Sequence, residues 1–334
     1  MIDCLSNPVW INPQTDFLLF LQNLRIGHFE NFDKFFLSVT IFGEFWLPTL
    51  ICTIFYWCID AKAGIYLFSL EGFNILLAHF FKMIACVYRP WILDNRIQPS
   101  ALAIPFAKGY SFPSGHSAMC SSVVGGIAYL LKQNKKLCCL LIGLVLLVGF
   151  SRMWLGVHTP QDVFVGLLIG LTLVFTVNKL INWAEENKNR YLYLLVIINI
   201  FAVIALIYVY FFNTYRIAYV SGKLLVNPNN LKYVMLVVYG YALGVINGLF
   251  LCRRFFPFEP KEASVKVRIL RGIIGVLGAA ILLKFVFQRV FLNIIDYKTA
   301  VSLSFLVGIS LTLIYPIIFT NFEKLLLKRE STKI

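Results

Sequence analysis

Three short polar segments stand out from an otherwise apolar chain, and their residue types are suited to handling phosphate. Their sequences are KMIACVYRP at 82–90, PSGH at 113–116 and SRMWLGVHTPQD at 151–162. Between them they supply three cations, two histidines and one carboxylate: Lys82, Arg89, Arg152, His116, His158 and Asp162. Charges beside hydrocarbon are costly without a partner. A phosphate dianion is such a partner, because arginine offers forked donors to its oxygens.

The start of the PSGH segment adds backbone donors. Ser114 and Gly115 precede an apolar run and are predicted to open a helix, where free N–H groups and the helix dipole favour an anion. Glycine at this position also lets the backbone approach a ligand closely. The two histidines titrate near neutral pH, so one can attack phosphorus while the other protonates the leaving oxygen.

Ordinary structural roles are also possible for these residues taken one at a time. Lys82 and Arg89 can extend to the interface from a helix end. Thr159, Pro160 and Asp162 have the pattern of an N-cap, a first helical residue and an acidic third residue, so Asp162 can serve as a helix cap. Their joint occurrence, in order and on one predicted membrane face, favours a single site.

The composition indicates that membrane helices position these segments. Hydrophobic residues make up 59% of the 334 and charged residues 14%, against roughly 45–50% and 25% in ordinary soluble proteins. This excludes a soluble globule and a disordered chain. An all-α, polytopic helical bundle of about nine spans is predicted, since each bilayer crossing needs about 20 apolar residues. The expected spans are 35–59, 63–88, 113–131, 137–156, 161–181, 191–212, 233–251, 269–291 and 301–320.

The distribution of basic residues predicts an orientation. Lys and Arg outnumber Asp and Glu by 30 to 16, and more of them fall in the odd-numbered connections and the C-terminal tail. By the positive-inside rule the C-terminus is cytoplasmic, the N-terminus is outside, and the three segments lie at the extracytoplasmic face of the plasma (inner) membrane. Residues 14–33 are expected to form an interfacial helix. No cleavable signal peptide is expected, because residues 1–16 lack a basic stretch followed by an apolar one.

Several other functions lack their sequence signatures. The net charge of +14 is not accompanied by a zinc-finger or basic-helix motif, so no nucleic-acid partner is expected. The eight cysteines form no CxxC pair and read as small buried hydrophobes. Since HExxH, DxD and acidic clusters are also absent from the sequence, no metal and no cofactor are expected.

The three segments resemble the signature of the type 2 phosphatidic acid phosphatase (PAP2) superfamily. That pattern reads KxxxxxxRP, PSGH and SRxxxxxHxxxD, and all three parts match within residues 82–162. The resemblance implies that His158 is the nucleophile of a phosphohistidine intermediate, Asp162 orients it, and His116 protonates the leaving group. It implies a phosphate site made of Lys82, Arg89, Ser114, Gly115 and Arg152.

The resemblance, which covers residues 35–181, and the hydropathy of the remaining chain together predict a division into three parts. Residues 1–34 would be an N-terminal interfacial segment, 35–181 the catalytic membrane core, and 182–334 additional helices with a cytoplasmic tail. Glu44 and Glu71 are expected to make packing contacts and are not assigned to catalysis. The loop 91–112 is long enough to form a partial lid, in which Arg96 and Lys108 could meet a second phosphate or headgroup.

The sequence leaves three functions possible, which differ in their substrate or in their reaction. A phosphorylated membrane lipid, either a phosphate such as phosphatidate or an isoprenyl diphosphate, suits a site at the bilayer interface. A soluble sugar phosphate is the alternative, because nine spans with an outward N-terminus resemble the glucose-6-phosphatase branch. A phosphotransferase or transporter is the third, with Asn247 and Lys284 in the extra spans. The intact pair of histidines with Asp162 favours hydrolysis.

Overall fold

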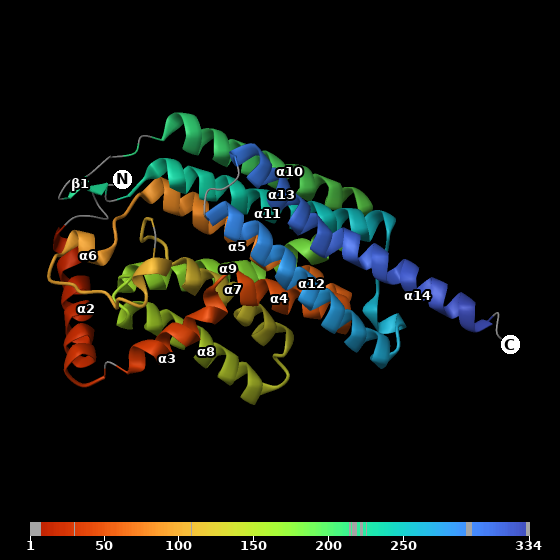
Figure 1. The fold of residues 1–334 in the computed structure, drawn as a ribbon, viewed down its shortest axis with the longest axis horizontal. Coiled ribbons are helices and arrows are strands. Elements are labelled where there is room, and N and C mark those ends of the chain that lie inside the picture. The colour runs from red at the N-terminus through yellow and green to blue at the C-terminus, as the bar shows by residue number, and fades with distance from the viewer. Residues whose placement is uncertain are drawn as a thin grey trace. The chain divides into compact units, whose positions relative to one another are not determined.

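A computed structural model describes the backbone of residues 8–29, 31–107, 109–213, 215, 219–220, 223–224, 226–291 and 296–331. Within these residues the predicted all-helical class is confirmed (Figure 1). The only extended pairing described is a two-residue antiparallel ladder in which Tyr219 faces Leu224 and Val220 faces Lys223. The fold is therefore built by helix packing.

The elements follow one another as a series of helices joined by short turns. They are α2 (Pro8–His28), α3 (Phe32–Val39), η1 (Thr40–Gly43), α4 (Trp46–Ile54), η2 (Phe55–Ile59), α5 (Ala61–Ala85), α6 (Pro90–Leu93), η3 (Ile104–Phe106), α7 (Gly115–Leu130), α8 (Lys135–Trp154), α9 (Pro160–Glu185), α10 (Lys188–Ile207), η4 (Tyr208–Phe212), β1 (Tyr219–Val220), β2 (Lys223–Leu224), α11 (Pro228–Phe255), η5 (Pro260–Glu262), α12 (Val265–Phe291), α13 (Tyr297–Ile309), η6 (Ser310–Ile314) and α14 (Tyr315–Ser331).

These helices account for the predicted membrane spans. Among the described residues, seven helical stretches are long and apolar enough to cross a bilayer, and the bent pair Phe32–Gly43 with Trp46–Ile59 makes an eighth. The remaining expected span, 113–131, corresponds to α7, which has only 16 residues. Most of its side chains are buried in protein, so α7 does not depend on lipid contact over a full bilayer thickness. The chain is a multi-pass membrane protein.

The N-terminal helix differs from the expected interfacial segment at both ends. Helix α2 ends at His28, and α3 begins at Phe32 and joins the bent first span. Arg25 of α2 lies 3.6 Å from Asp33 of α3, and Asp33 accepts a hydrogen bond from the Trp154 indole at 3.1 Å. These contacts tie the N-terminal segment to the end of α8.

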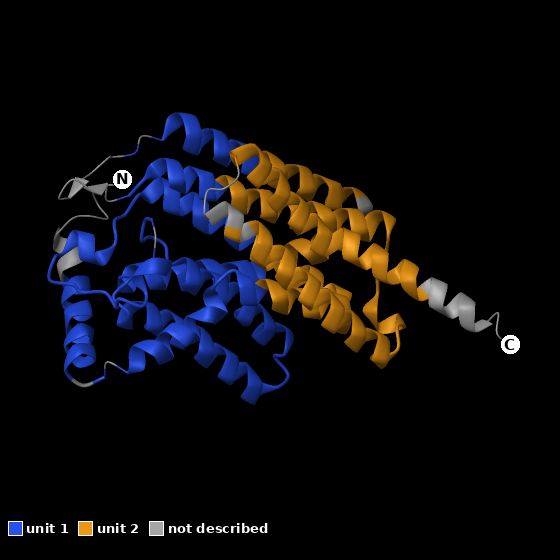
Figure 2. Cartoon of the chain, viewed as in Figure 1, with its two compact units in different colours: residues 1–48, 73–176, 202–235 blue, residues 49–72, 177–201, 236–334 orange. Residues whose placement is uncertain are grey.

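The chain forms two compact units, each discontinuous in sequence (Figure 2). One comprises residues 1–48, 73–176 and 202–235, and the other comprises 49–72, 177–201 and 236–334. Helices α4, α5, α9, α10 and α11 contribute residues to both units. All three motif segments fall in the first unit. The sequence-based division at residues 34 and 181 stays a prediction.

Within the first unit, glycines let α9 approach α7 closely. A Cβ at Gly166 would lie 2.6 Å from the Ser114 carbonyl oxygen, and one at Gly170 would lie 2.7 Å from that of Ala118. Such small-residue contacts are a common way for membrane helices to pack. At the same end, the Ser114 amide donates to the Asp162 carbonyl at 2.9 Å. The starts of α7 and α9 are thereby held together, which places PSGH beside Asp162.

Candidate active site

The third segment forms a tight turn between α8 and α9. Arg152 lies in the last turn of α8, and Gly156 turns the chain with a φ of 70°, in the left-handed region that favours glycine. Helix α9 then begins at Pro160. The Thr159 hydroxyl accepts from the Asp162 amide at 3.2 Å, while Asp162 Oδ2 accepts from the Thr159 amide at 2.8 Å. This reciprocal cap fixes the Asp162 carboxylate, so the capping role also supports the site.

His158 is held between this carboxylate and an arginine. Its Nδ1 lies 3.4 Å from Asp162 Oδ2, and both side chains are 2% exposed. Arg89 Nη1 lies 2.9 Å from His158 Nε2. Because a guanidinium can only donate, this contact assigns a lone pair to Nε2 and the proton to Nδ1, facing Asp162. The neutral imidazole therefore presents its unprotonated nitrogen to the arginine.

Ser111 is a member of this arrangement that the sequence did not reveal. Its hydroxyl donates to Asp162 Oδ2 at 2.5 Å and lies 3.3 Å from His158 Nδ1, and the residue is fully buried. A single serine at the end of the 91–112 loop has no spacing signal of its own. Only the packing of this loop against the α8–α9 turn shows that it completes the surroundings of the carboxylate.

Replacing Ser111 with alanine is expected to lower kcat by about 10-fold with little change in KM. A hydrogen bond to a charged group contributes about 1.5–3 kcal/mol. Only part of this loss raises the free energy of the transition state relative to the bound substrate. Steady-state kinetics would check it, and Ser111→Thr should restore most of the rate. An unchanged kcat in Ser111→Ala would show that this hydroxyl does not position the acid–histidine pair.

Backbone carbonyls hold two of the cations. Lys82 Nζ donates to the Tyr110 oxygen at 3.0 Å, Arg89 Nε donates to Gly109 at 3.1 Å, and Arg89 Nη1 donates to Val157 at 2.9 Å. Two of these acceptors lie in the loop before PSGH and the third lies in the α8–α9 turn. Neutral acceptors orient the cations without neutralising them, so their charge remains to bind an anion.

The third cation, Arg152, and the second histidine, His116, have side-chain nitrogens without a hydrogen-bond partner among the described residues. Arg152 is 1% exposed, and none of its three guanidinium nitrogens makes a hydrogen bond with any described residue. The buried Nε2 of His116 has none either within the same part of the chain. His116 lies within electrostatic reach of the three cations and of His158. Buried donors of this kind are uncommon in folded proteins and indicate a site that takes an acceptor-rich anion.

The N-terminus of α7 faces the same group. Ser114 caps the helix, its Oγ accepting from the Ser117 amide at 3.4 Å. A Cβ at Gly115 would meet nothing within 4 Å, so open space lies at the first residue of the helix. The predicted site residues of all three segments are therefore brought together around one buried cluster of cations.

Two regions of the chain match known families. Residues 62–186 match the family described as the PAP2 superfamily, and residues 236–329 match the one described as the PAP2 superfamily phosphatase, transmembrane extension. The chain carries a PAP2 superfamily domain followed by a PAP2 transmembrane extension. The predicted resemblance is confirmed, and the helices beyond the catalytic segments, which the motifs did not cover, carry a family match of their own.

Curated relatives of this PAP2 protein act on phosphorylated lipids according to their names. It is 36% identical over 104 residues to phosphatidylglycerophosphatase B of Bacillus subtilis, covering 29% of this chain and 50% of the relative. It is 35% identical over 114 residues to an undecaprenyl-diphosphatase of Sulfolobus acidocaldarius, covering 34% and 53%. The chain thus spans about half the length of these relatives. No solved structure matches it at comparable significance.

The other residues singled out in the sequence differ in their surroundings. Arg96 is bound by Asp94 at 2.7 Å and lies 3.8 Å from Asp16, with its side chain 60% exposed. Lys108 lies outside the described residues. Glu44 is within electrostatic reach of Arg152, a link that no sequence pattern indicated.

In the second unit, Glu71 is buried and accepts hydrogen bonds from the Thr49 hydroxyl and from Tyr241 at 3.3 Å. Asn247 of α11 donates to the Asn199 side chain of α10 at 3.2 Å. Both sets of contacts join helices to one another. Lys284 is exposed.

Proposed function

We propose that this protein is a membrane-embedded phosphatase that hydrolyses a lipid phosphate or diphosphate through a phosphohistidine at His158. The observation that carries the proposal is the buried histidine–aspartate pair beside three cations, one of which has no hydrogen-bond partner among the described residues. The names of the two relatives support a lipid substrate. The match to a transmembrane extension supports a substrate that is anchored in the membrane and reaches the site from there.

The first step transfers the phosphoryl group to the protein. His158 Nε2 attacks phosphorus, forming a P–N bond as the P–O bond to the leaving group breaks. His116 donates the proton that the departing oxygen takes up. The Nδ1 proton of His158 faces Asp162, which stabilises the positive charge that develops on the imidazole. Lys82, Arg89 and Arg152 hold the phosphoryl oxygens and offset their charge in the transition state.

The second step returns the histidine to its starting state. Water attacks phosphorus, His116 accepts a proton from it, and the P–N bond breaks to release inorganic phosphate. The substrate oxygens compete for the Arg89 donor that contacts Nε2, which frees the nitrogen lone pair for attack. In this scheme the cations of the chain supply the electrostatic stabilisation, so no metal ion is required.

The pH dependence is expected to extend into the acid range. Burial, reinforced by the charges of Arg89, Arg152 and Lys82, holds the pKa of His158 well below its ordinary value of 6.5. The nucleophile is then neutral at pH values where an ordinary imidazole is protonated. We expect kcat/KM, corrected for substrate ionisation, to keep its plateau below pH 6.5.

The same shift predicts lower stability in acid. The unfolded chain takes up a proton on this histidine as pH falls through about 6.5, while the folded chain does not, so the free energy of unfolding decreases. Thermal unfolding measured between pH 5 and 8 checks this trend.

For the activity, a kcat/KM that falls to half of its plateau value at pH 6.5 or above would contradict the lowered pKa of His158.

Orientation is the second part of the proposal. The excess of basic residues in the odd-numbered connections supports a cytoplasmic C-terminus and an outside N-terminus, with the site at the outer face of the plasma membrane. Lys135→Cys, in a variant whose eight native cysteines are changed to serine, is expected to react with a membrane-impermeant maleimide only after lysis. Labelling in intact cells would reverse the orientation.

A substrate panel tests the activity. Purified protein in detergent is given farnesyl diphosphate, a phosphatidate and glucose 6-phosphate, and phosphate release is measured with and without EDTA. Release from the lipids, unaffected by EDTA, is expected. Preference for glucose 6-phosphate would favour a sugar phosphatase, and transfer to an added alcohol without phosphate release would favour a phosphotransferase. Loss with EDTA that Mg²⁺ restores would refute the metal-independent scheme.

A further inference from the structure

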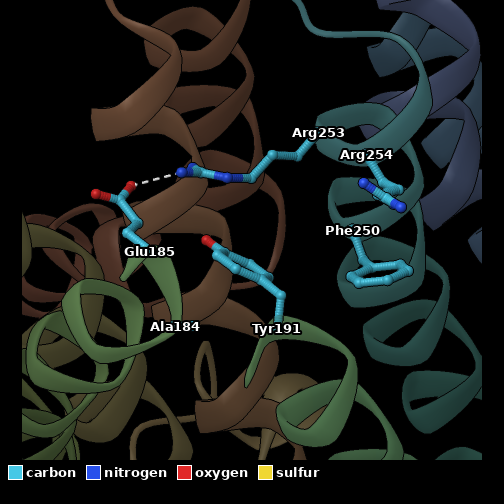
Figure 3. Close-up of a pocket in the computed structure, with 6 residues that line it drawn as sticks. All are labelled: Ala184, Glu185, Tyr191, Phe250, Arg253 and Arg254. Atoms are coloured by element: carbon cyan, nitrogen blue, oxygen red, sulfur yellow. Dashed lines mark hydrogen bonds and ion pairs between the residues drawn. The ribbon is translucent and has the colours of Figure 1, made fainter. Parts of the chain in front are cut away.

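A pocket of about 310 Å³ lies in the second unit, among the end of α9, the start of α10 and the end of α11 (Figure 3). It is lined by Ala184, Glu185, Tyr191, Phe250, Arg253 and Arg254. Its volume is at the small end of the roughly 300–1,000 Å³ typical of ligand pockets. None of these residues belongs to the three motif segments, so the pocket is separate from the candidate active site.

The polar side of the pocket carries a net positive charge. Arg253 Nη2 contacts Glu185 Oε1 at 2.7 Å, and the Arg253 guanidinium lies 4.9 Å from the centre of the Tyr191 ring. Arg254 is exposed and pairs with no carboxylate in the described part of the chain; its guanidinium lies 5.9 Å from the Phe255 ring. After Glu185 is neutralised by Arg253, the charge of Arg254 remains.

One residue that lines the pocket, Tyr191, carries a buried hydroxyl. The Tyr191 hydroxyl is shielded from solvent and makes no hydrogen bond to any described residue. Figure 3 shows it directed toward the side where Glu185 and Arg253 meet. A buried donor without an acceptor costs free energy that a ligand oxygen would recover. The pocket therefore offers one hydroxyl donor and a cation to an oxygen-rich anion.

The side chains around the pocket indicate which kind of molecule carries the anion. Phe250 and Ala184 form an apolar wall, and large apolar and aromatic side chains are exposed on the helices around the pocket, among them Trp183, Leu192, Tyr193 and Phe255. These lie at the ends of membrane spans, where aromatic residues meet the headgroup layer. An anion attached to acyl chains satisfies both the polar and the apolar sides.

We propose that this pocket binds the phosphate-bearing headgroup of an anionic membrane phospholipid. Basic pockets between membrane helices on the cytoplasmic side are suited to such headgroups, and the predicted orientation places the ends of α9 and α11 on that side. The proposal is independent of the catalytic mechanism, because the site shares no residue with it.

Native mass spectrometry of the purified full chain tests the proposal with phosphatidylglycerol, phosphatidylcholine and inorganic phosphate as probes. Wild-type protein is expected to bind phosphatidylglycerol at least about 10-fold more tightly than phosphatidylcholine. Arg254→Gln should weaken this binding about 5-fold, given about 1 kcal/mol for a basic residue near the headgroups. Tyr191→Phe should weaken it by about the same factor through the lost donor.

Two controls separate the site from general charge effects. Lys266→Gln removes one exposed charge at the start of α12 outside the pocket and should change the affinity less than about 2-fold. Arg254→Lys keeps the charge and should stay close to wild type, and phosphate release from a short-chain substrate checks that every variant is folded. Equal binding of the two lipids, or equal effects of Arg254→Gln and Lys266→Gln, would overturn the proposal. Displacement of the lipid by millimolar inorganic phosphate would instead assign the pocket to a soluble anion and overturn the lipid assignment.

Discussion

Changing His158 to alanine is expected to reduce phosphate release by at least about 10⁴-fold while the protein remains folded. In catalytic triads, removal of the nucleophile or its base costs on the order of 10⁶ in kcat, and the remaining electrostatic stabilisation and binding supply the residual rate. His158 has the only imidazole in the described residues that contacts both Asp162 and Arg89.

The measurement is phosphate release by purified wild type and variant, with His79→Gln as a matched control. His79 lies on α5, and its ring contacts the Ile75 carbonyl of its own helix at 3.1 Å, so its loss should leave most of the rate. Wild type incubated with ³²P-labelled substrate and quenched in base should retain label on histidine, and His158→Ala should not. A variant as active as wild type would eliminate His158 as the nucleophile.

Arg152→Met is expected to lower kcat/KM about 10²–10³-fold and to leave the protein as stable as wild type or more stable. Removing one preorganised donor to a developing negative charge has this catalytic cost. The stability effect has the opposite sign, because a buried guanidinium without hydrogen-bond partners is unfavourable for the fold and methionine fills a similar volume. Activity and stability therefore separate at this residue.

A second buried arginine offers the contrast. Arg271 is 5% exposed and is bound by both carboxylate oxygens of Glu323 at 2.5 Å. Arg271→Met leaves that carboxylate unpaired, so it should lower the unfolding temperature. Thermal unfolding of the three proteins, with and without vanadate, checks both expectations. Vanadate should stabilise wild type and not Arg152→Met. A large destabilisation by Arg152→Met would mean that this side chain is held by the fold and is not reserved for a ligand.

Composition and motif spacing are enough to predict the membrane helices and the family of this protein. Long apolar runs are enough to indicate helices in a bilayer, and the distances along the chain between Lys82, His116 and His158 are enough to indicate the family. The same reasoning overestimated α7, because a helix buried in protein needs fewer residues than one that must cover the bilayer by itself.

The contacts that complete the site could not be predicted from composition and motif spacing. Ser111 is one of many serines, and it gains a role only because the loop returns to the α8–α9 turn. Asp162 had two competing interpretations, as a helix cap and as the partner of His158. The structure shows both contacts at once, on the same carboxylate oxygen. Arg96 was a candidate for a second phosphate, but a local ion pair with Asp94 occupies it.

The carbonyl oxygens that orient Lys82 and Arg89 have a consequence for how this protein can diversify. The loop supplies them from Gly109 and Tyr110 through its main chain, so the exposed side chains of the stretch 91–107, such as Leu102, Ile104 and Phe106, can change without removing these hydrogen bonds. What must be kept is the path of the loop, including the left-handed Gly109. Changes in the exposed part of the loop can therefore alter which molecules reach the proposed phosphate site while the proposed catalytic residues stay in place.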